Sequence, residues 1–155
     1  LTVNQTANTA FFASITGAVT LVKNGSGRLT LAKPCTTSGD FVVSNGTLAV
    51  SETGALGENS TNIWVAGGTL SLSNSAAISD QASLFIADGG SAKVELAAGV
   101  NESVGYLYFG DKMQRAGTYS ATAGAGVQHV DVEHFAGSGI LRVRHDTAGT
   151  LIRVR

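Results

Sequence analysis

Apolar and small polar residues alternate in short runs along most of the chain, and the runs are separated by turns that contain glycine. The residues that precede the turn glycines, Asn24, Asn45, Gly67 and Asp88, follow one another at intervals of 21, 22 and 21 residues. Asn, Gly and Asp tolerate the left-handed backbone conformations that tight corners need. The pattern therefore predicts four similar units, each built around one corner.

Each corner lies between two runs that read as strands. The runs before the corners are residues 19–23, 41–44, 62–66 and 83–87. Because side chains alternate across a strand, the runs after the corners separate into two faces. The face predicted to be core carries Leu29 and Leu31, Leu48 and Val50, Leu70 and Leu72, and Val94 and Leu96. The face predicted to meet solvent carries Thr30, Ala49, Ser71 and Glu95.

A constant interval of about 21 residues with two or three short strands is typical of one coil of a parallel β-solenoid. An antiparallel sandwich is the alternative, because Asn-Gly and Gly-Gly between apolar runs are also hairpin signals. We predict a single all-β domain over residues 1–155. Its parts are an N-terminal strand or cap (1–14), about four solenoid coils (15–98) and C-terminal capping strands (99–155).

The C-terminal third loses the period and gains aromatic residues. It reads as a strand, a turn at Gly110 and Asp111, and a returning strand, so we predict a β-hairpin cap over the end of the stack. Two amphipathic runs follow, one with Leu141 and Val143 and one with Ile152 and Val154. These two runs are expected to pair with each other or to continue the stack.

Charge and cysteine content restrict the partners. Ten basic and eleven acidic residues give a net charge of −1, which argues against nucleic acid or an anionic membrane as the main partner. No apolar run approaches the roughly 18 residues of a membrane span, so we expect no direct membrane insertion. Cys35 is the single cysteine, so no intrachain disulfide forms, and we expect a buried, inert thiol. No cofactor is predicted.

The segment from Phe12 to Ala32 resembles the passenger-associated, or autotransporter-associated, β-strand repeat of Gram-negative bacteria. Leu21, Lys23, Gly25, Gly27, Leu29 and Leu31 fill the pattern of that repeat. The end of the chain is similar to the closing module of long repeat proteins, notably of Verrucomicrobia and Planctomycetes. The resemblance implies a right-handed parallel β-helix that is secreted or displayed at the outer membrane and serves adhesion or display.

The best catalytic candidate is Asp146 with Thr147, in a stretch that resembles the Asp-Thr-Gly signature of aspartic peptidases, although Ala148 stands before Gly149. Such a site needs a second carboxylate to share a proton. Within the chain, the candidates for this second carboxylate are Asp40, Asp88 and Asp111. A further candidate is Asp146 of a second copy of the chain. A polar turn explains Asp146 equally well.

His129, Asp131 and Glu133 share one face of a predicted strand, with His134 on the other face. The alternating spacing spreads the three side chains over roughly 13 Å, which is too far for one ion. We therefore predict a solvated strand edge and no metal site.

An apolar ladder of Leu21, Val42, Trp64 and Phe85 is expected on the outer face of the strands that precede the corners. Either the C-terminal segment covers this ladder or the ladder contacts a partner. The candidate partners are a host or environmental glycoprotein or glycan, or another copy of the chain.

The preferred hypothesis is a non-catalytic, secreted or surface-displayed β-solenoid with an adhesive or structural role. The alternative is a secreted aspartic-type endopeptidase that uses Asp146 on glycoproteins such as mucin. A third possibility is carbohydrate binding along Trp64 and Phe85.

Overall fold

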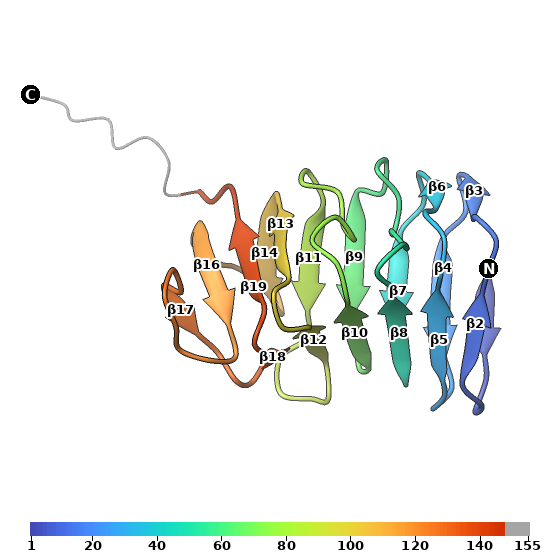
Figure 1. The fold of residues 1–155 in the computed structure, drawn as a ribbon, viewed down its shortest axis with the longest axis horizontal. Coiled ribbons are helices and arrows are strands. Elements are labelled where there is room, and N and C mark those ends of the chain that lie inside the picture. The colour runs from blue at the N-terminus through green and yellow to red at the C-terminus, as the bar shows by residue number, and fades with distance from the viewer. Residues whose placement is uncertain (148–155) are drawn as a thin grey trace, which may run out of the picture.

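The chain folds into a stack of short parallel strands, a β-solenoid of about five turns, in a computed structural model that describes residues 1–147. Figure 1 shows the coils side by side from the N-terminus to the C-terminal third. All regular elements in residues 1–147 are strands. This part of the chain holds no helix long and apolar enough to cross a membrane.

Two sheets form the long sides of the stack. The seven-stranded sheet contains, in spatial order, β1 (Thr2–Asn4), β4 (Leu21–Asn24), β7 (Phe41–Val43), β9 (Asn62–Val65), β11 (Ser83–Ile86), β14 (Tyr106–Phe109) and β15 (Lys112–Met113). The six-stranded sheet contains β18 (Phe135–Gly137), β12 (Lys93–Leu96), β10 (Thr69–Leu72), β8 (Thr47–Val50), β5 (Arg28–Leu31) and β2 (Thr9–Phe11).

Two smaller sheets complete the structure. One contains β13 (Asn101–Val104), β19 (Ile140–Val143), β16 (Gly117–Ser120) and β17 (His129–Val130). The other pairs β3 (Thr16–Gly17) with β6 (Thr36–Thr37).

Equivalent strands of successive coils pair in parallel and in register. Leu48 of β8 lies opposite Leu70 of β10, and Leu70 lies opposite Val94 of β12. The parallel solenoid is confirmed, and the antiparallel sandwich is wrong. Within residues 1–147, antiparallel pairing joins β14 to β15 and β16 to β19, both in the C-terminal third.

The predicted core columns of the six-stranded sheet are all buried. The opposite face was predicted to meet solvent, and this prediction fails for two of its residues, since Ala49 and Ser71 are also buried. Arg28 explains this difference, since its guanidinium nitrogen Nη2 donates to Ser71 Oγ at 3.3 Å. Arg28 starts β5, and Ser71 is two strands away in β10, so the arginine side chain crosses β8 and shields the small residues beneath it.

The predicted corners are turns in the structure, and at three of the four the glycine itself has the left-handed conformation. Gly25, Gly46 and Gly89 have φ angles of 75°, 66° and 66°. At Gly46 a Cβ would also collide with the carbonyl oxygen of Gly25 in the coil before it. Glycine at these places therefore permits both the turn and the close stacking of coils.

Stacking extends further at both ends than the predicted range of 15–98. β1 pairs with β4 and β2 pairs with β5, so the first eleven residues already form part of a coil. At the other end β14 pairs with β11. The stack therefore has about five turns where four were predicted.

The C-terminal third contains the predicted hairpin, β14 and β15, which turns at Gly110 (φ 57°). The run with Leu141 and Val143 forms β19 and continues the stack by pairing in parallel with β13. β18 also continues the stack, because it pairs in parallel with β12. The predicted run with Ile152 and Val154 lies outside the described residues.

Candidate contact surface

The outer face of the seven-stranded sheet carries an apolar column that we call the outer ladder. Its members occupy matching register positions in five neighbouring strands and are Val22, Val42, Trp64, Phe85 and Tyr108. Three of these five residues were predicted for this face. Tyr108 was missed because the aromatic segment around it was assigned to the cap, although it follows the same strand pattern.

Leu21, predicted for the outer ladder, is instead fully buried and lies in register with Phe41 in the core. The first coil places Val22 outward and Lys23 inward, one position away from the prediction. Outward placement of Leu21 implied that its neighbours Thr20 and Val22 point inward, because side chains alternate along a strand. Both expectations are wrong, because Val22 lies in the outer ladder and Thr20 is exposed. The physical reason lies at the corner, where the buried Lys23 side chain has a specific set of acceptors.

Lys23 is buried at the corner of the first coils. Its ammonium donates to the carbonyl oxygens of Asn24 (2.8 Å), Gly25 (2.8 Å) and Asn45 (3.3 Å). Burial lowers the pKa of Lys23 from its ordinary value. Three carbonyl acceptors nevertheless satisfy the ammonium, so an inward lysine links two successive corners.

The aromatic members of the outer ladder stack face to face. The ring centroids of Trp64 and Phe85 are 3.8 Å apart with an interplanar angle of 8°, and those of Phe85 and Tyr108 are 4.5 Å apart at 14°. Both ring faces of Phe85 are therefore occupied. Trp64 is 40% exposed, and its free ring face points toward β7, where Val42 offers a short side chain.

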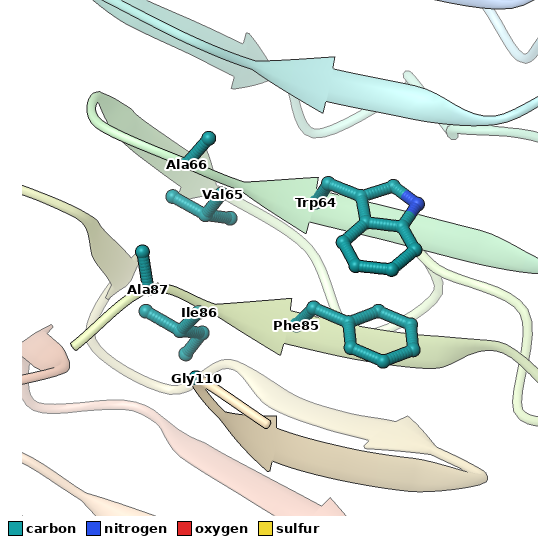
Figure 2. Close-up of a pocket in the computed structure, with 7 residues that line it drawn as sticks. All are labelled: Trp64, Val65, Ala66, Phe85, Ile86, Ala87 and Gly110. Carbon is teal, nitrogen blue, oxygen red and sulfur yellow. The ribbon is translucent and has the colours of Figure 1, made fainter. Parts of the chain in front are cut away.

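A groove of about 190 Å³ runs beside the outer ladder (Figure 2). One wall is formed by Trp64 and Phe85, and the backbone positions of Val65 and Ile86 lie along it. Small residues follow on the same outer face and keep the groove open; they are Ala66, Ala87 and Gly110. The groove crosses neighbouring coils, so a ligand in it contacts several strands at once.

The described part of the C-terminal segment leaves Trp64 uncovered. β15 extends the seven-stranded sheet beside Tyr108, where Tyr108 and Met113 are paired, and the later strands join the other sheets. Of the two explanations considered for the ladder, cover by residues 99–147 is therefore not observed at Trp64.

Asp146 and Thr147 lie just beyond β19. A carboxylate oxygen of Asp146 accepts a hydrogen bond of 2.7 Å from the backbone amide of Ala116. This contact ties the end of the described chain to the loop before β16, which is a structural role. Thr147 is exposed, and Ala148 and Gly149 of the peptidase-like stretch lie outside the described residues.

The predicted strand through His129, Asp131 and Glu133 ends at Val130. Asp131 instead opens a turn, in which its Oδ1 accepts from the backbone amides of Glu133 (2.9 Å) and His134 (2.8 Å). His129 stacks on Tyr119 with ring centroids 4.5 Å apart. In residues 1–147 no group of three or more side chains is arranged to hold a metal ion.

His134 anchors this turn to the stack. Its Nδ1 lies 2.9 Å from Asp131 Oδ2 and its Nε2 lies 3.1 Å from Asp88 Oδ1, while its ring stacks on Phe109 at 3.8 Å. Burial alone would raise the pKa of Asp131, but the hydrogen bonds from His134 and from the backbone of Glu133, together with the electrostatic interaction with His134, hold that pKa below its ordinary value. Lys93 adds a second anchor, because Nζ donates to the carbonyl oxygens of residues 132 and 133.

Glu102 is a buried acid that no sequence pattern singled out. Its carboxylate accepts from the backbone amides of Ala77 (2.7 Å), Ile78 (3.3 Å) and Ser103 (3.0 Å). Burial raises the pKa of Glu102 to about 7, although these three amides lower it, and the charge of Asp80 raises it further. Its inward position in an alternating strand is the signal that would have identified it.

Cys35 is a free, buried thiol, as predicted. Burial raises the pKa of Cys35, while a hydrogen bond with the backbone of Ile15 lowers it, and the net effect is upward. A thiol with a raised pKa is less nucleophilic at neutral pH, so Cys35 contributes to the core.

Comparisons with protein-family models, with curated proteins and with solved structures find no match to this chain.

Proposed function

We infer that the chain is a non-catalytic β-solenoid element of a secreted or surface-displayed protein, and that it acts by contact along the outer ladder. The fold supports a structural or adhesive role, because stacked coils produce a long, regular side on which one strand position repeats at every coil. The resemblance of the first coils to passenger-associated repeats supports secretion or surface display.

The observation that carries this proposal is the exposed Trp64 at the end of a stack of three aromatic rings. Soluble proteins seldom leave large apolar side chains exposed together unless they serve in binding. The stack holds the Trp64 ring in place, and the groove beside it supplies a recess for a chain that lies along the solenoid. A fixed ring next to a recess suits a partner with a flat apolar surface.

The partner we propose is a glycan, carried by a host or environmental glycoprotein. Sugar rings present flat patches of C–H groups that pack on aromatic side chains. Because Phe85 is enclosed on both faces, packing of this kind takes place at the open face of Trp64, above Val42 and Val22. The edge of Phe85 then lines the groove for the next part of the glycan.

The test measures retention of the protein on immobilised mucin and on the same mucin after enzymatic removal of its glycans. We expect the wild-type protein to bind the intact mucin, and Trp64→Ala to lose most of that binding with an unchanged unfolding temperature. Phe12→Ala is the matched control, because Phe12 is 73% exposed but lies at the N-terminal end, away from the groove.

Equal retention of wild type and Trp64→Ala would contradict the proposal, as would binding that survives glycan removal. Cleavage of mucin that is lost on Asp146→Ala would contradict the non-catalytic role and favour the peptidase alternative.

A further inference from the structure

A row of polar side chains runs beside the outer ladder of the seven-stranded sheet. Its members stand two residues before those of the ladder along the chain, so they lie on the same outer face. They are Thr20, Asp40, Asn62, Ser83 and Tyr106, and we call them the polar row. Asp40 is the one charged residue among them. The glycan contact proposed for Trp64 does not involve this row.

Hydrogen bonds join the polar row across neighbouring coils. Asn62 Nδ2 donates to Asp40 Oδ1 at 3.2 Å, and the backbone amide of Asp40 donates to Thr20 Oγ1 at 3.3 Å. Asp40 therefore lies directly beside Asn62, just as Val42 lies beside Trp64 two residues further along. Asp40 and Asn62 are both partly exposed, so a ligand can reach the atoms that these bonds leave open.

The bond between the two side chains fixes which of their atoms face a ligand. A carboxylate only accepts hydrogen bonds, so the amide of Asn62 turns its nitrogen toward Asp40 and its oxygen away. The same Nδ2 donates to Thr61 Oγ1 at 3.4 Å, which uses its second hydrogen. Within residues 1–147 no group donates to Asp40 Oδ2 or Asn62 Oδ1. The pair therefore presents two acceptor oxygens and no uncommitted donor.

The ring of Trp64 extends toward this pair. Figure 2 shows it lying along β9 on the side away from Ala66, which is the side of the polar row. Residues two apart in a strand are about 6.7 Å from each other, and neighbouring strands are about 4.8 Å apart. The area between the open face of Trp64 and Asp40 is therefore close to the footprint of one sugar ring, with the short side chain of Val42 as its floor.

This arrangement fits the two kinds of surface on a sugar ring. The flat C–H face packs on Trp64, while hydroxyl groups at the ring edge donate to the two acceptor oxygens. Two neighbouring acceptors call for two neighbouring donors, which adjacent hydroxyl groups of a pyranose supply. A carboxylate or sulfate instead brings acceptor oxygens and a negative charge against Asp40. Unmatched acceptors and like charges both cost free energy, so the pair opposes acidic sugars.

We propose that Asp40 and Asn62 form the polar half of the glycan site and select uncharged sugars that carry two adjacent free hydroxyl groups. This selection rests on the glycan contact proposed for Trp64 and adds the class of sugar that the contact accepts. Stacking on Trp64 alone does not distinguish sugars with similar C–H faces. Asp40 supplies the discrimination, because it repels the acidic sugars as well as binding the neutral ones.

The test measures the protein concentration that gives half-maximal retention on immobilised mucin and on the same mucin after sialidase has removed its acidic sugars. We expect wild type to need a roughly tenfold lower concentration on the desialylated surface. Asp40→Asn removes the charge but keeps an acceptor for Asn62, so its two values should differ by about twofold or less. Glu52→Gln, the matched control, makes the same change in charge at an exposed turn after β8 in the other sheet and should keep the wild-type preference.

A second treatment examines the hydroxyl pair. Periodate cleaves the carbon–carbon bond between two adjacent hydroxyl-bearing carbons, so periodate-treated desialylated mucin should lose most of its retention of wild type. Retention that survives periodate would overturn the proposal, as would an unchanged preference in Asp40→Asn. The preference is a ratio between two surfaces, so a smaller folded fraction of the variant does not alter it.

The same experiment separates this proposal from the glycan contact itself. If Trp64→Ala loses retention while Asp40→Asn keeps the wild-type preference, the contact at Trp64 stands and the role of Asp40 is overturned. Equal retention of wild type and Trp64→Ala overturns both.

Discussion

The first and the last strands of the described residues pack in different ways. At the C-terminal end the aromatic side chains of Phe109, Tyr119 and Phe135 pack together, and the turn with His134 is anchored on Asp88. Among the first residues, β1 and β2 line an apolar pocket with Leu21, Leu29 and Leu31. A repeat that buries its core by stacking needs a different sequence wherever stacking stops.

Truncation of one phenylalanine at each end gives the largest contrast. Phe135→Ala empties a buried site between Phe109 and Tyr119, so we expect the free energy of unfolding to fall by about 3–5 kcal/mol. Phe11→Ala removes a partly exposed ring and should reduce it by about 1 kcal/mol or less. Urea denaturation of the two variants and of wild type measures both losses. Equal losses would contradict the difference in packing between Phe135 and Phe11.

The pH dependence of stability sharpens the comparison, because Glu102 lies in the C-terminal half. Its folded pKa of about 7 exceeds the ordinary value of 4.5, so the folded state binds the proton more tightly than the unfolded chain. The stabilisation is complete below the unfolded pKa and is lost as pH rises from about 4.5 to about 7, a loss on the order of 2–3 kcal/mol. The negative charge of Asp80, which pairs with Arg144 at 3.1 Å, acts in the same direction.

Glu102→Gln is the variant that isolates this effect, because glutamine retains an acceptor oxygen for the amides of Ala77 and Ile78 but does not titrate. Urea denaturation at pH 4.5 and pH 7 should show a clearly smaller decline for the variant than for wild type. If both proteins lose the same stability, Glu102 is not the responsible group.

The sequence predicted the coils well because their signal is repeated. Leucine columns such as Leu48 and Leu70 face the core at every turn, and a slip of one residue would expose a whole column. The first coil carries one lysine at an inward position, and this single exception reversed the assignment of Leu21 and Val22. A buried lysine contradicts residue-type preferences, and the carbonyl acceptors that permit it belong to two different corners.

The contact surface was predicted in part. Trp64 and Phe85 were assigned to the outer face from alternation, but their stacking and the addition of Tyr108 depend on register between coils. The anchors of the C-terminal third escaped prediction because they join residues far apart in the chain, as His134 joins Asp88. Long-range pairs of this kind leave no periodic pattern.

Amide hydrogen exchange, followed residue by residue, tests most directly the claim that the aromatic packing of the C-terminal third protects the strands there. Amides of an open edge exchange through small local openings, whereas those of a packed end require larger ones. We predict the lowest protection in β1 and β2, a maximum in β8, β10 and β12, and protection in β16 and β19 that stays near that maximum. Equally low protection in β1, β2, β16 and β19 would contradict the account.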